Sequence, residues 1–378
     1  MQFLPAFEYN GSTLLFFVFA LIALIQLLFV IFIHGRLAFF KDQVNDADKN
    51  LPPLSIIIIA RNESDNLYEY LPSILDQNYP EFEVIVINHQ STDDSAFLLA
   101  AFAKQYNNLK IIEVAKSQHL KPGKKLAITV GIKGAKYEHI LLTDADCKPN
   151  SSNWLNKMAS KFLSGKEIVM GYSPYYKKRG FLNKTIRFDT AWIGINYLSM
   201  ALARMPYMSV GRNLAYTKTV FKKVNGFKSH YAIPSGDDDL FIQEAAKKSN
   251  YCISIDEDSF TYSEPHSNWS GWIRQKSRHF STSAHYNVFK KLMLGIYPLT
   301  MLILLISFVI LMFDNEYRWI TLSIFIFLIG IKWWIHGKCL LKLKEIGLLK
   351  FLPFWDIYYS ILSPILFYTT EKKDANKW

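Results

Sequence analysis

An uninterrupted apolar stretch near the N-terminus constrains the fold of this chain more than any other feature. Thr13–Ile33 is apolar throughout except for Gln26, and no Lys or Arg precedes it. At 1.5 Å per residue, a helix of this length spans the roughly 30 Å hydrocarbon core of a bilayer. A cleaved signal peptide fits poorly, because its apolar core is shorter and follows basic residues. We therefore expect a transmembrane helix within residues 1–40, with its C-terminal end cytoplasmic because Arg36 and Lys41 follow it.

The C-terminal part of the chain carries further apolar stretches. Leu292–Phe313 and Trp319–Ile335 are long enough to cross a bilayer. Phe351–Tyr368 is interrupted by two prolines and by Asp356, so it either spans or re-enters the membrane. The sequence therefore predicts a membrane region with two or three spans over residues 292–378.

Between these regions, residues 41–291 are predicted to form a soluble domain in which strand-like and helix-like runs alternate. The predicted strands are Ser55–Ala60, Phe82–Asn88, Lys110–Val114, Ile140–Thr143 and, further along, Ile168–Met170. The predicted helices are Glu63–Asp76, capped by Asn62 or Ser64, Asp93–Tyr106, capped by Ser91 or Thr92, Lys124–Lys136 and Phe181–Ala203. This alternation favours an α/β fold with a mostly parallel sheet covered by helices on both faces. Ligands of such sheets bind beyond the carboxyl ends of the strands.

Charge and cysteine content exclude some classes of function. The net charge of +11 has two ordinary sources, the basic flanks of membrane segments and a site for anionic substrates. No nucleic-acid-binding motif accompanies it, so no nucleic acid partner is expected. The three cysteines, Cys147, Cys252 and Cys339, are odd in number and far apart. They predict neither a disulfide framework nor a zinc site.

The fourth predicted strand leads into an acidic pair, Asp144 and Asp146. Because side chains alternate along a strand, the two carboxylates are expected to point the same way at its end. Adjacent carboxylates repel unless a cation lies between them. Oxygen ligands of this kind favour Mg²⁺ or Mn²⁺, which usually also bind substrate phosphates. For an Asp-x-Asp pair taken alone, a solvated turn is the alternative.

Three further polar stretches can contribute to a site at the same sheet edge. Ala60–Glu63 and Asn88–Asp93 follow the first two strands, where a base or ribose can bind, although each can equally be a plain helix start. Lys121–Lys124 opens a helix, and a helix N-terminus attracts phosphate. Lysines in such a position are usually solvated, so this stretch alone indicates little.

Two later stretches carry concentrated charge. Asp237–Asp239 places three carboxylates together, which costs repulsion unless a cation or a function compensates, and an exposed helix cap is the alternative. Gln275, Arg278 and His279 are spaced i, i+3, i+4 and share one helical face. An arginine there can bind a diphosphate through two hydrogen bonds, and a basic helix beside the membrane is the rival interpretation.

Taken in order, these stretches resemble those of membrane-anchored family 2 glycosyltransferases. They are SIIIIARNE, VIVINHQSTDD, GKKLAITVGI, LLTDADC, GRNLAY, SGDDDLF and QKSRH, and they cover roughly residues 54–286. The resemblance implies a GT-A fold and inversion of configuration at the sugar carbon. It also implies a nucleotide-diphosphate sugar donor and a divalent metal ion, Mg²⁺ or Mn²⁺.

The resemblance also implies roles for individual residues. Asp144 and Asp146 match the metal-binding Asp-x-Asp pair, and Asp237 is the first choice for the catalytic base, with Asp238 second. The residues implied in binding the nucleotide sugar are Ala60, Arg61, Glu63, Asn88, His89, Asp93, Lys124, Asp144, Gln275 and Arg278. The residues implied on the acceptor side are Gly211, Asn213, Leu214 and His279.

Two departures from the family pattern bear on the substrates. Asn88 and His89 stand where many members have two aspartates, so Asp93, an amide or an imidazole must replace the carboxylate that grips uracil. His279 stands where the Gln-x-x-Arg-Trp motif has Trp, which weakens stacking on an acceptor sugar.

The resemblance implies a hexosyltransferase-type enzyme of the bacterial inner membrane with a cytoplasmic catalytic domain. A UDP-sugar is the expected donor, and a lipid or lipid-linked acceptor is favoured because three or four spans are few for a one-chain pore. The product would be a cell envelope glycan or glycolipid. Processive polysaccharide synthesis is the alternative, and a nucleotidyltransferase, a hydrolase or a non-catalytic membrane scaffold are alternatives of other classes.

Overall fold

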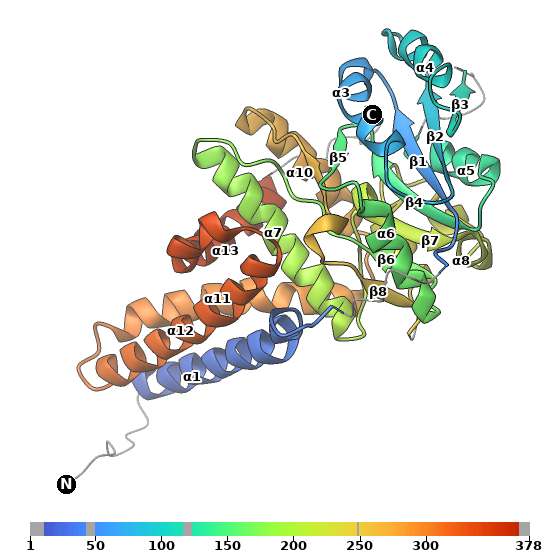
Figure 1. Ribbon diagram of the computed structural model, residues 1–378. Helices are drawn as coiled ribbons and strands as arrows, with labels where there is room; N and C mark the ends of the chain where they lie inside the picture. The colour runs from blue at the N-terminus through green and yellow to red at the C-terminus, as the bar shows by residue number, and fades with distance from the viewer. Residues whose placement is uncertain (1–10, 43–49, 116–122, 248, 370–378) are drawn as a thin grey trace. The chain divides into compact units, whose positions relative to one another are not determined.

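The computed structural model describes residues 11–42, 50–115, 123–247 and 249–369. These residues form two compact units (Figure 1). Of the described residues, those up to Phe40 and those from Tyr286 to Thr369 form one unit, and those of 41–285 form the other.

A seven-stranded sheet with the order β3-β2-β1-β4-β7-β6-β8 is the frame of the second unit. Its strands are β1 (Leu54–Ala60), β2 (Phe82–His89), β3 (Leu109–Val114), β4 (His139–Asp144), β6 (Ile168–Met170), β7 (Leu214–Thr217) and β8 (Tyr251–Ile253). Strands β1 to β4 pair in parallel, whereas β7 pairs antiparallel with both β4 and β6. A second sheet of two strands joins β5 (Cys147–Pro149) to β9 (Thr261–Ser263).

The helices of this unit cover both faces of the main sheet (Figure 1). They are α3 (Ser64–Leu75), α4 (Ser95–Ala103), α5 (Lys124–Gly134), α6 (Trp154–Ala159), α7 (Phe181–Leu202), α8 (Lys218–Lys223), α9 (Asp239–Ala245) and α10 (Trp269–Ser283). Ile56 and Ile58 of β1 pack in one core with side chains of α3, α4 and α6. On the opposite face α5 lies so close that a Cβ on Gly131 would be 2.8 Å from Ile57 and 2.9 Å from Ile87. The predicted α/β fold with helices on both faces of a mostly parallel sheet is therefore confirmed.

The predicted caps of the first two helices are wrong, because one carboxylate serves both. Asp93 accepts hydrogen bonds from the backbone N–H of Ser64 at 3.0 Å and of Ser95 at 3.1 Å. A carboxylate at two helix N-termini satisfies unpaired N–H groups and the positive ends of both helix dipoles. The side chain of Asn62, predicted as a cap, instead accepts a hydrogen bond from the backbone N–H of Thr92 at 2.7 Å. Asn62 and Asp93 thus tie together the two loops that follow β1 and β2.

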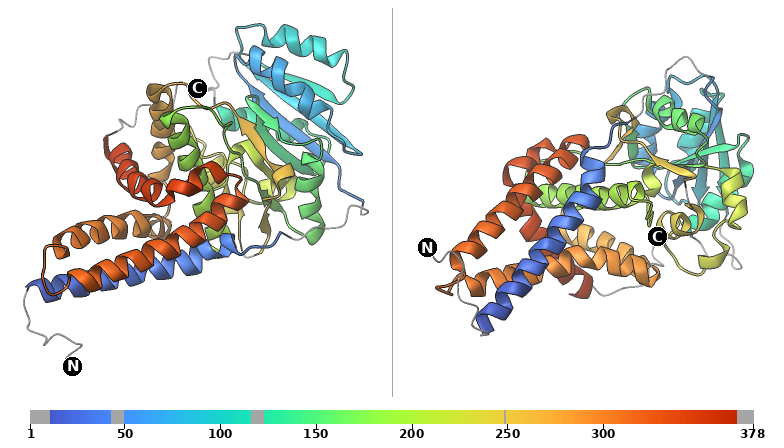
Figure 2. Two further views of the ribbon diagram at one scale, coloured as in Figure 1. Left: turned by 60° about the vertical axis from the view of Figure 1, so that its left-hand side comes forward. Right: turned by 90° about the horizontal axis from the view of Figure 1, so that it is seen from below.

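The other unit consists mainly of long apolar helices. They are α1 (Gly11–Phe29), which continues through a π-helical turn (Val30–His34) into α2 (Gly35–Ala38), then α11 (Val288–Leu311), α12 (Arg318–Lys342) and α13 (Leu352–Thr369). Helix α1 packs along α11 and α12 (Figure 2). Among the described residues, three helical segments are long and apolar enough to cross a membrane, at 11–38, 288–311 and 318–342. The three apolar stretches predicted as spans therefore do form such helices, whereas α13 is not among them.

The polar residue in the interior of the first apolar stretch, Gln26, has defined partners. The side-chain amide of Gln26 donates to the carbonyl oxygen of Tyr297 at 2.8 Å and to the hydroxyl of Thr300 at 2.6 Å. Gln26 is fully buried. A hydrogen bond of this kind fixes which face of α1 meets α11.

A buried ion pair connects α13 to the rest of its unit. Lys332 of α12 lies 2.6 Å from Asp356 of α13, and both side chains are at most 4% exposed. The hydroxyl of Tyr297 in α11 donates to the other carboxylate oxygen of Asp356 at 2.7 Å. Charges in an apolar helical bundle are costly unless they are paired, so Asp356 holds α13 against α11 and α12.

We predict that Asp356→Ala destabilises this unit strongly, because it leaves the Lys332 ammonium buried without its counter-charge. Breaking a buried ion pair costs about 3–5 kcal/mol. The measurement is the midpoint of thermal unfolding of the purified protein in detergent.

Two further variants test the reason for this effect. Replacing both partners, as Lys332→Met with Asp356→Leu, should restore much of the stability, since it removes the uncompensated charge. Lys350→Met, which removes an exposed lysine of the same unit, should leave the midpoint unchanged. A double variant no more stable than Asp356→Ala would contradict the explanation.

Candidate active site

The candidate site begins at the edge of the main sheet where β1, β2 and β4 end. The strand register pairs Ala60 with Asn88 and Ile59 with Asp144. The ends of three neighbouring strands therefore lie side by side, which is where ligands bind in sheets of this kind. Of the predicted phosphate-binding stretch at the start of α5, Lys121 and Pro122 lie outside the described residues.

A lysine ammonium lies between two of the predicted acidic groups. Lys124 Nζ is 2.7 Å from Asp144 Oδ1 and 3.6 Å from Asp237 Oδ2. Burial alone would lower the pKa of Lys124, but the carboxylates of Asp144 and Asp237 outweigh it and raise the pKa. The residue therefore carries its positive charge at neutral pH and joins the end of β4 to the segment before α9.

Gly211 lies against the same group of charges. Its backbone N–H donates to Asp238 Oδ2 at 2.9 Å. A Cβ built on Gly211 would lie 3.5 Å from an oxygen of Asp237 and 3.6 Å from Lys124 Nζ. Four predicted stretches, which begin or end at Lys124, Asp144, Gly211 and Asp237, therefore meet at one place.

The Asp-x-Asp pair differs from the predicted geometry in one respect. Strand β4 ends at Asp144, and Asp146 lies in the turn that follows, so strand alternation does not determine where Asp146 points. Burial would raise the pKa of Asp144, but Lys124, followed by Arg212 and Arg278, lowers it. Burial raises the pKa of Asp146, and the neighbouring Asp144 raises it further. Negative charge is thus well compensated at Asp144 and poorly compensated at Asp146.

The two candidates for the catalytic base have different surroundings. Asp238 accepts backbone hydrogen bonds on both oxygens, from Asp239 at 2.8 Å and from Gly211 at 2.9 Å. It caps α9, and burial together with Asp239 raises its pKa to about 7. Asp237 is 7% exposed, and burial raises its pKa while Lys124 lowers it in part. Both carboxylate oxygens of Asp238 are thus engaged in hydrogen bonds with backbone N–H groups of other residues, whereas the carboxylate of Asp237 faces Lys124.

The predicted nucleotide-binding residues of the first two loops lie close to the acidic pair. Burial raises the pKa of Glu63, and the hydrogen bond from Asn66 opposes this effect. The negative charges of Asp146 and Asp144 raise the pKa of Glu63 further. Burial lowers the pKa of His89, and the positive charge of Arg61 lowers it further. Ala60 and Asn88 are paired at the strand ends. Both carboxylate oxygens of Asp93 are already used at the two helix N-termini.

Two of the predicted acceptor-side residues are in the protein core. Asn213 is fully buried and accepts a hydrogen bond from Trp154 Nε1 at 3.1 Å. Its amide donates to the carbonyl oxygens of Tyr172 at 2.9 Å and Ser259 at 2.7 Å. Leu214, the first residue of β7, is also fully buried. Asn213 therefore fixes the backbone that positions Gly211.

Helix α10 brings the remaining predicted residues. Gln275 donates to the hydroxyl of Tyr175 at 2.9 Å, and the charge of Arg278 reaches Asp144. His279 is exposed. Part of the predicted set meets at one acidic centre, namely Lys124, Asp144, Asp146, Gly211, Asp237, Asp238 and Arg278. Asn213, Leu214 and Asp93 are in supporting positions.

Sequence reasoning missed Arg212, which lies next to Gly211 in the stretch GRNLAY. Its guanidinium carbon is 4.6 Å from the centre of the Tyr175 ring, and its charge acts on both Asp144 and Asp146. The available signal was a basic residue between two residues that the family resemblance had already singled out.

The residues present fit a divalent cation of the Mg²⁺ or Mn²⁺ type. Asp144 and Asp146 offer carboxylate oxygens, and the raised pKa of Asp146 marks negative charge that a cation would relieve. Within the described part of the chain, no group of three or more His, Cys, Asp or Glu side chains is arranged to hold a metal. Such an ion would take its remaining ligands from substrate phosphates and water, as Mg²⁺ usually does.

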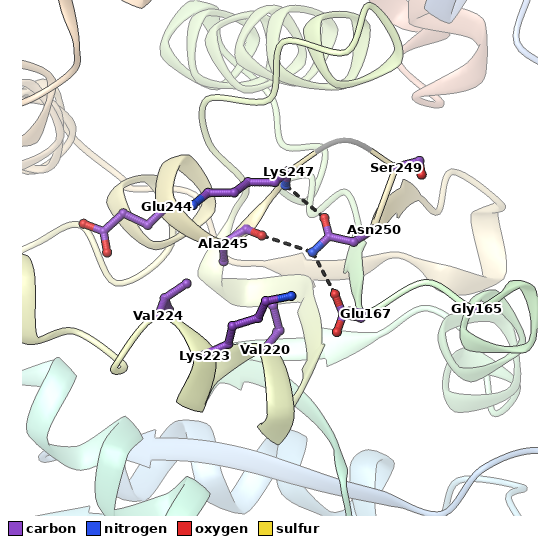
Figure 3. Close-up of a pocket in the computed structure, with 10 residues that line it drawn as sticks. All are labelled: Gly165, Glu167, Val220, Lys223, Val224, Glu244, Ala245, Lys247, Ser249 and Asn250. Carbon is purple, nitrogen blue, oxygen red and sulfur yellow. Dashed lines mark hydrogen bonds between the residues drawn. The ribbon is translucent and has the colours of Figure 1, made fainter.

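A hollow of about 440 Å³ is lined by residues that do not belong to this cluster (Figure 3). The amide of Asn250 donates there to Glu167 at 2.9 Å and to the carbonyl oxygen of Ala245 at 3.1 Å. Asn250 also accepts a hydrogen bond from the backbone of Lys247 at 3.0 Å. These polar groups satisfy one another, and none of the residues lining this hollow belongs to the acidic centre.

Comparison with protein families agrees with this geometry. Residues 55–224 match the model described as glycosyl transferase family 2. The chain contains a family 2 glycosyltransferase domain. The matched residues include Asp144, Lys124 and Gly211, whereas Asp237 and α10 follow the matched segment.

Individual relatives are similar to parts of this chain. The probable glycosyltransferase YdaM of Bacillus subtilis (strain 168) is 24% identical over 239 residues, which are 61% of this chain and 55% of the relative. A poly-beta-1,6-N-acetyl-D-glucosamine synthase of Staphylococcus epidermidis is 32% identical over 103 residues, 27% of this chain and 24% of that protein. The chain thus spans about half of the first relative and a quarter of the second.

The fold is also found in a solved structure. The mannosyltransferase PcManGT from Pyrobaculum calidifontis, in complex with GDP-Man and Mn²⁺, superposes with a TM-score of 0.57 at 16% identity. The match covers 89% of this chain and 98% of that one. The predicted GT-A fold is therefore confirmed.

We predict that Asn213→Ala acts on stability rather than on acceptor binding. It leaves Trp154 and two carbonyl groups without their partner, at about 1–3 kcal/mol for each buried group. Thermal unfolding checks this, with Asn156→Ala as control, because Asn156 makes a hydrogen bond to Asn78 nearer the surface. An unchanged unfolding midpoint together with a raised acceptor KM would return Asn213 to the acceptor side.

Proposed function

We propose that this chain is an inverting glycosyltransferase that transfers a sugar from a nucleotide-diphosphate sugar to a lipid or lipid-linked acceptor. The observation that carries the proposal is the position of Lys124 between Asp144 and Asp237, inside a unit that contains a family 2 glycosyltransferase domain. One carboxylate belongs to the pair suited to a metal and the diphosphate, and the other lies where a base is needed. The proposed metal ligand, Asp144, and the proposed base, Asp237, therefore both lie within 4 Å of the Lys124 ammonium.

In the proposed mechanism Asp237 is the general base. It removes the proton from an acceptor hydroxyl while that oxygen attacks the anomeric carbon, and the nucleoside diphosphate leaves from the opposite face. General-base catalysis typically contributes a factor of about 10²–10⁴, or about 3–5 kcal/mol. Burial raises the pKa of Asp237, which strengthens its carboxylate as a base.

Basic residues around the acidic pair stabilise the leaving group. Lys124, Arg212 and Arg278 all act electrostatically on Asp144, so they lie where charge develops on the diphosphate. Mg²⁺ or Mn²⁺ held by Asp144 and Asp146 would supply further charge neutralisation when bound. The donor is proposed to be a UDP-sugar, with Asn88 or His89 taking the place of the carboxylate that grips uracil.

The proposed acceptor follows from the apolar helices. Three segments long and apolar enough to cross a bilayer support an integral membrane protein, with the catalytic unit on the cytoplasmic side. A lipid acceptor presents its head group close to a domain tethered in this way. Exposed His279, in the place of a stacking Trp, offers little to hold a growing polymer.

The decisive experiment incubates membranes containing the protein with a panel of labelled nucleotide sugars. Lipid-soluble product is separated from polymer, and membranes containing Asp237→Asn serve as the blank. Labelled lipid that depends on Asp237 supports the proposal. Labelled polymer would indicate a polysaccharide synthase, and release of nucleotide without any glycosylated product would indicate a hydrolase.

We predict that Asp237→Asn lowers kcat by at least about 10²-fold, because the amide cannot accept the proton. Donor binding should be nearly unchanged, since the side chain keeps its shape. The checks are the rate of sugar transfer and the Kd of the donor. Asp65→Asn, at an exposed position in the first turn of α3, is the matched control and should behave as wild type.

The pH profile separates the two candidate bases. A base must be ionised, so kcat falls as the pH drops through its pKa, which burial raises above the usual aspartate range at Asp237. An acidic limb near pH 7 that is lost in Asp238→Asn would assign the base to Asp238, whose pKa is about 7. Full activity of both Asp237→Asn and Asp238→Asn would overturn the assignment altogether.

A further inference from the structure

A line of contacts leads from helix α10 to the acidic pair. Gln275 donates to the hydroxyl of Tyr175 at 2.9 Å. The Tyr175 ring lies under the guanidinium of Arg212, at 4.6 Å from ring centre to Cζ. Arg212 in turn acts on the charges of Asp144 and Asp146. Gln275 is thereby connected to the acidic pair through two intervening side chains.

Arg212 is held in a defined orientation beside this pair. Its Nη1 donates to Ser263 Oγ at 3.1 Å and its Nη2 donates to the carbonyl oxygen of Ser173 at 3.0 Å. Ser263 Oγ also lies 3.0 Å from Cys147 Sγ, and Cys147 directly follows Asp146. The guanidinium is thus fastened to the strand that leaves the Asp-x-Asp turn.

Donors of Arg212 remain for a ligand. A guanidinium has five N–H groups, and the two hydrogen bonds above use two of them. Among the described residues, its remaining N–H groups have no hydrogen-bond partner, and the side chain is half-buried rather than sealed. A planar guanidinium with spare donors is suited to binding a phosphate through two hydrogen bonds.

The ring beneath Arg212 depends on Gln275 for its polar contact. Tyr175 is 8% exposed, and its hydroxyl bonds to Gln275. Helix α10 is itself fixed by the buried ion pair between Lys276 and Asp189 of α7 at 2.6 Å. A cation above an aromatic ring gains about 0.5–2 kcal/mol, so the orientation of the ring matters to the guanidinium.

We propose that Arg212 binds the diphosphate of the donor and that Gln275 is a positioning residue acting on it through Tyr175. The inference rests on the proposed function. It assigns Gln275 to the donor side by an indirect route, with no contact to the acceptor.

The test measures binding rather than turnover, on the full-length protein in detergent. Calorimetry with UDP and with GDP, each in the presence of Mn²⁺, gives a Kd for the wild type and for each variant. Gln275→Met and Tyr175→Phe should each raise the Kd of the nucleoside diphosphate that the wild type binds by about three- to tenfold. Arg212→Lys should raise it by about ten- to a hundredfold, because the ammonium lacks the planar pair of donors.

The Kd of a double variant shows whether Gln275 and Tyr175 act on nucleotide binding through one shared hydrogen bond or through separate effects. The double variant Gln275→Met/Tyr175→Phe should bind no more weakly than either single variant, since both remove the same hydrogen bond. Acceptor KM should be unchanged in all of them. Arg274→Gln, at an exposed position of the same helix, is the control and should leave the Kd as in the wild type.

Other outcomes overturn the inference in different ways. Unchanged Kd values with a raised acceptor KM in Gln275→Met would place Gln275 at the acceptor, and an additive double variant would break the relay, while the glycosyltransferase proposal stands in both cases. A wild-type protein that binds neither nucleoside diphosphate and transfers no sugar would overturn both proposals together.

Discussion

The ammonium of Lys124 is the interaction on which the site depends. Asp144, Asp146, Asp237 and Asp238 come from two stretches that are almost a hundred positions apart in the chain. Even so, Asp144 raises the pKa of both Asp146 and Asp237, and Asp238 raises that of Asp237 further. Carboxylates gathered in this way repel unless positive charge lies among them. Lys124 supplies that charge at the start of α5, with Arg212 and Arg278 at the periphery. The sheet sets the position of Asp144, and the lysine permits the segment before α9 to approach it.

The parts of this structure that could be predicted from sequence are those with a local cause. The β-branched run of β1 and the long apolar, charge-poor run of α7 are local features of the sequence, and both elements appear near their predicted bounds. The position of Asp144 follows from parallel strands ending at one edge. The family resemblance then supplied an order of stretches that no single pattern would have established.

The parts that could not be predicted depend on partners far away in sequence. Asp93 was expected to bind a ligand, but its carboxylate lies at the N-termini of two helices at once. The side-chain amide of Asn213 is chemically suited to bind a ligand. Only the fold reveals that it forms hydrogen bonds with Trp154 and two backbone carbonyl groups instead. Arg212 was passed over because a basic residue beside a glycine has no periodicity to mark it. In each case the sequence shows the functional group of the side chain but does not show which residue it contacts in the fold.

The hydrogen bonds of Gln26 have a consequence for biosynthesis. Its partners in α11 are first met at Tyr297, 271 positions later in the chain. At a synthesis rate of about 5–20 residues per second, the ribosome takes about 15–50 seconds to cover that distance. In the proposed membrane setting, α1 therefore waits in the lipid with a solitary amide while the whole of the second unit is translated. Until α11 is made, the side-chain amide of Gln26 needs another partner, which can be another helix, water or an insertion factor. That partner acts on the chain before α1 can pack against α11.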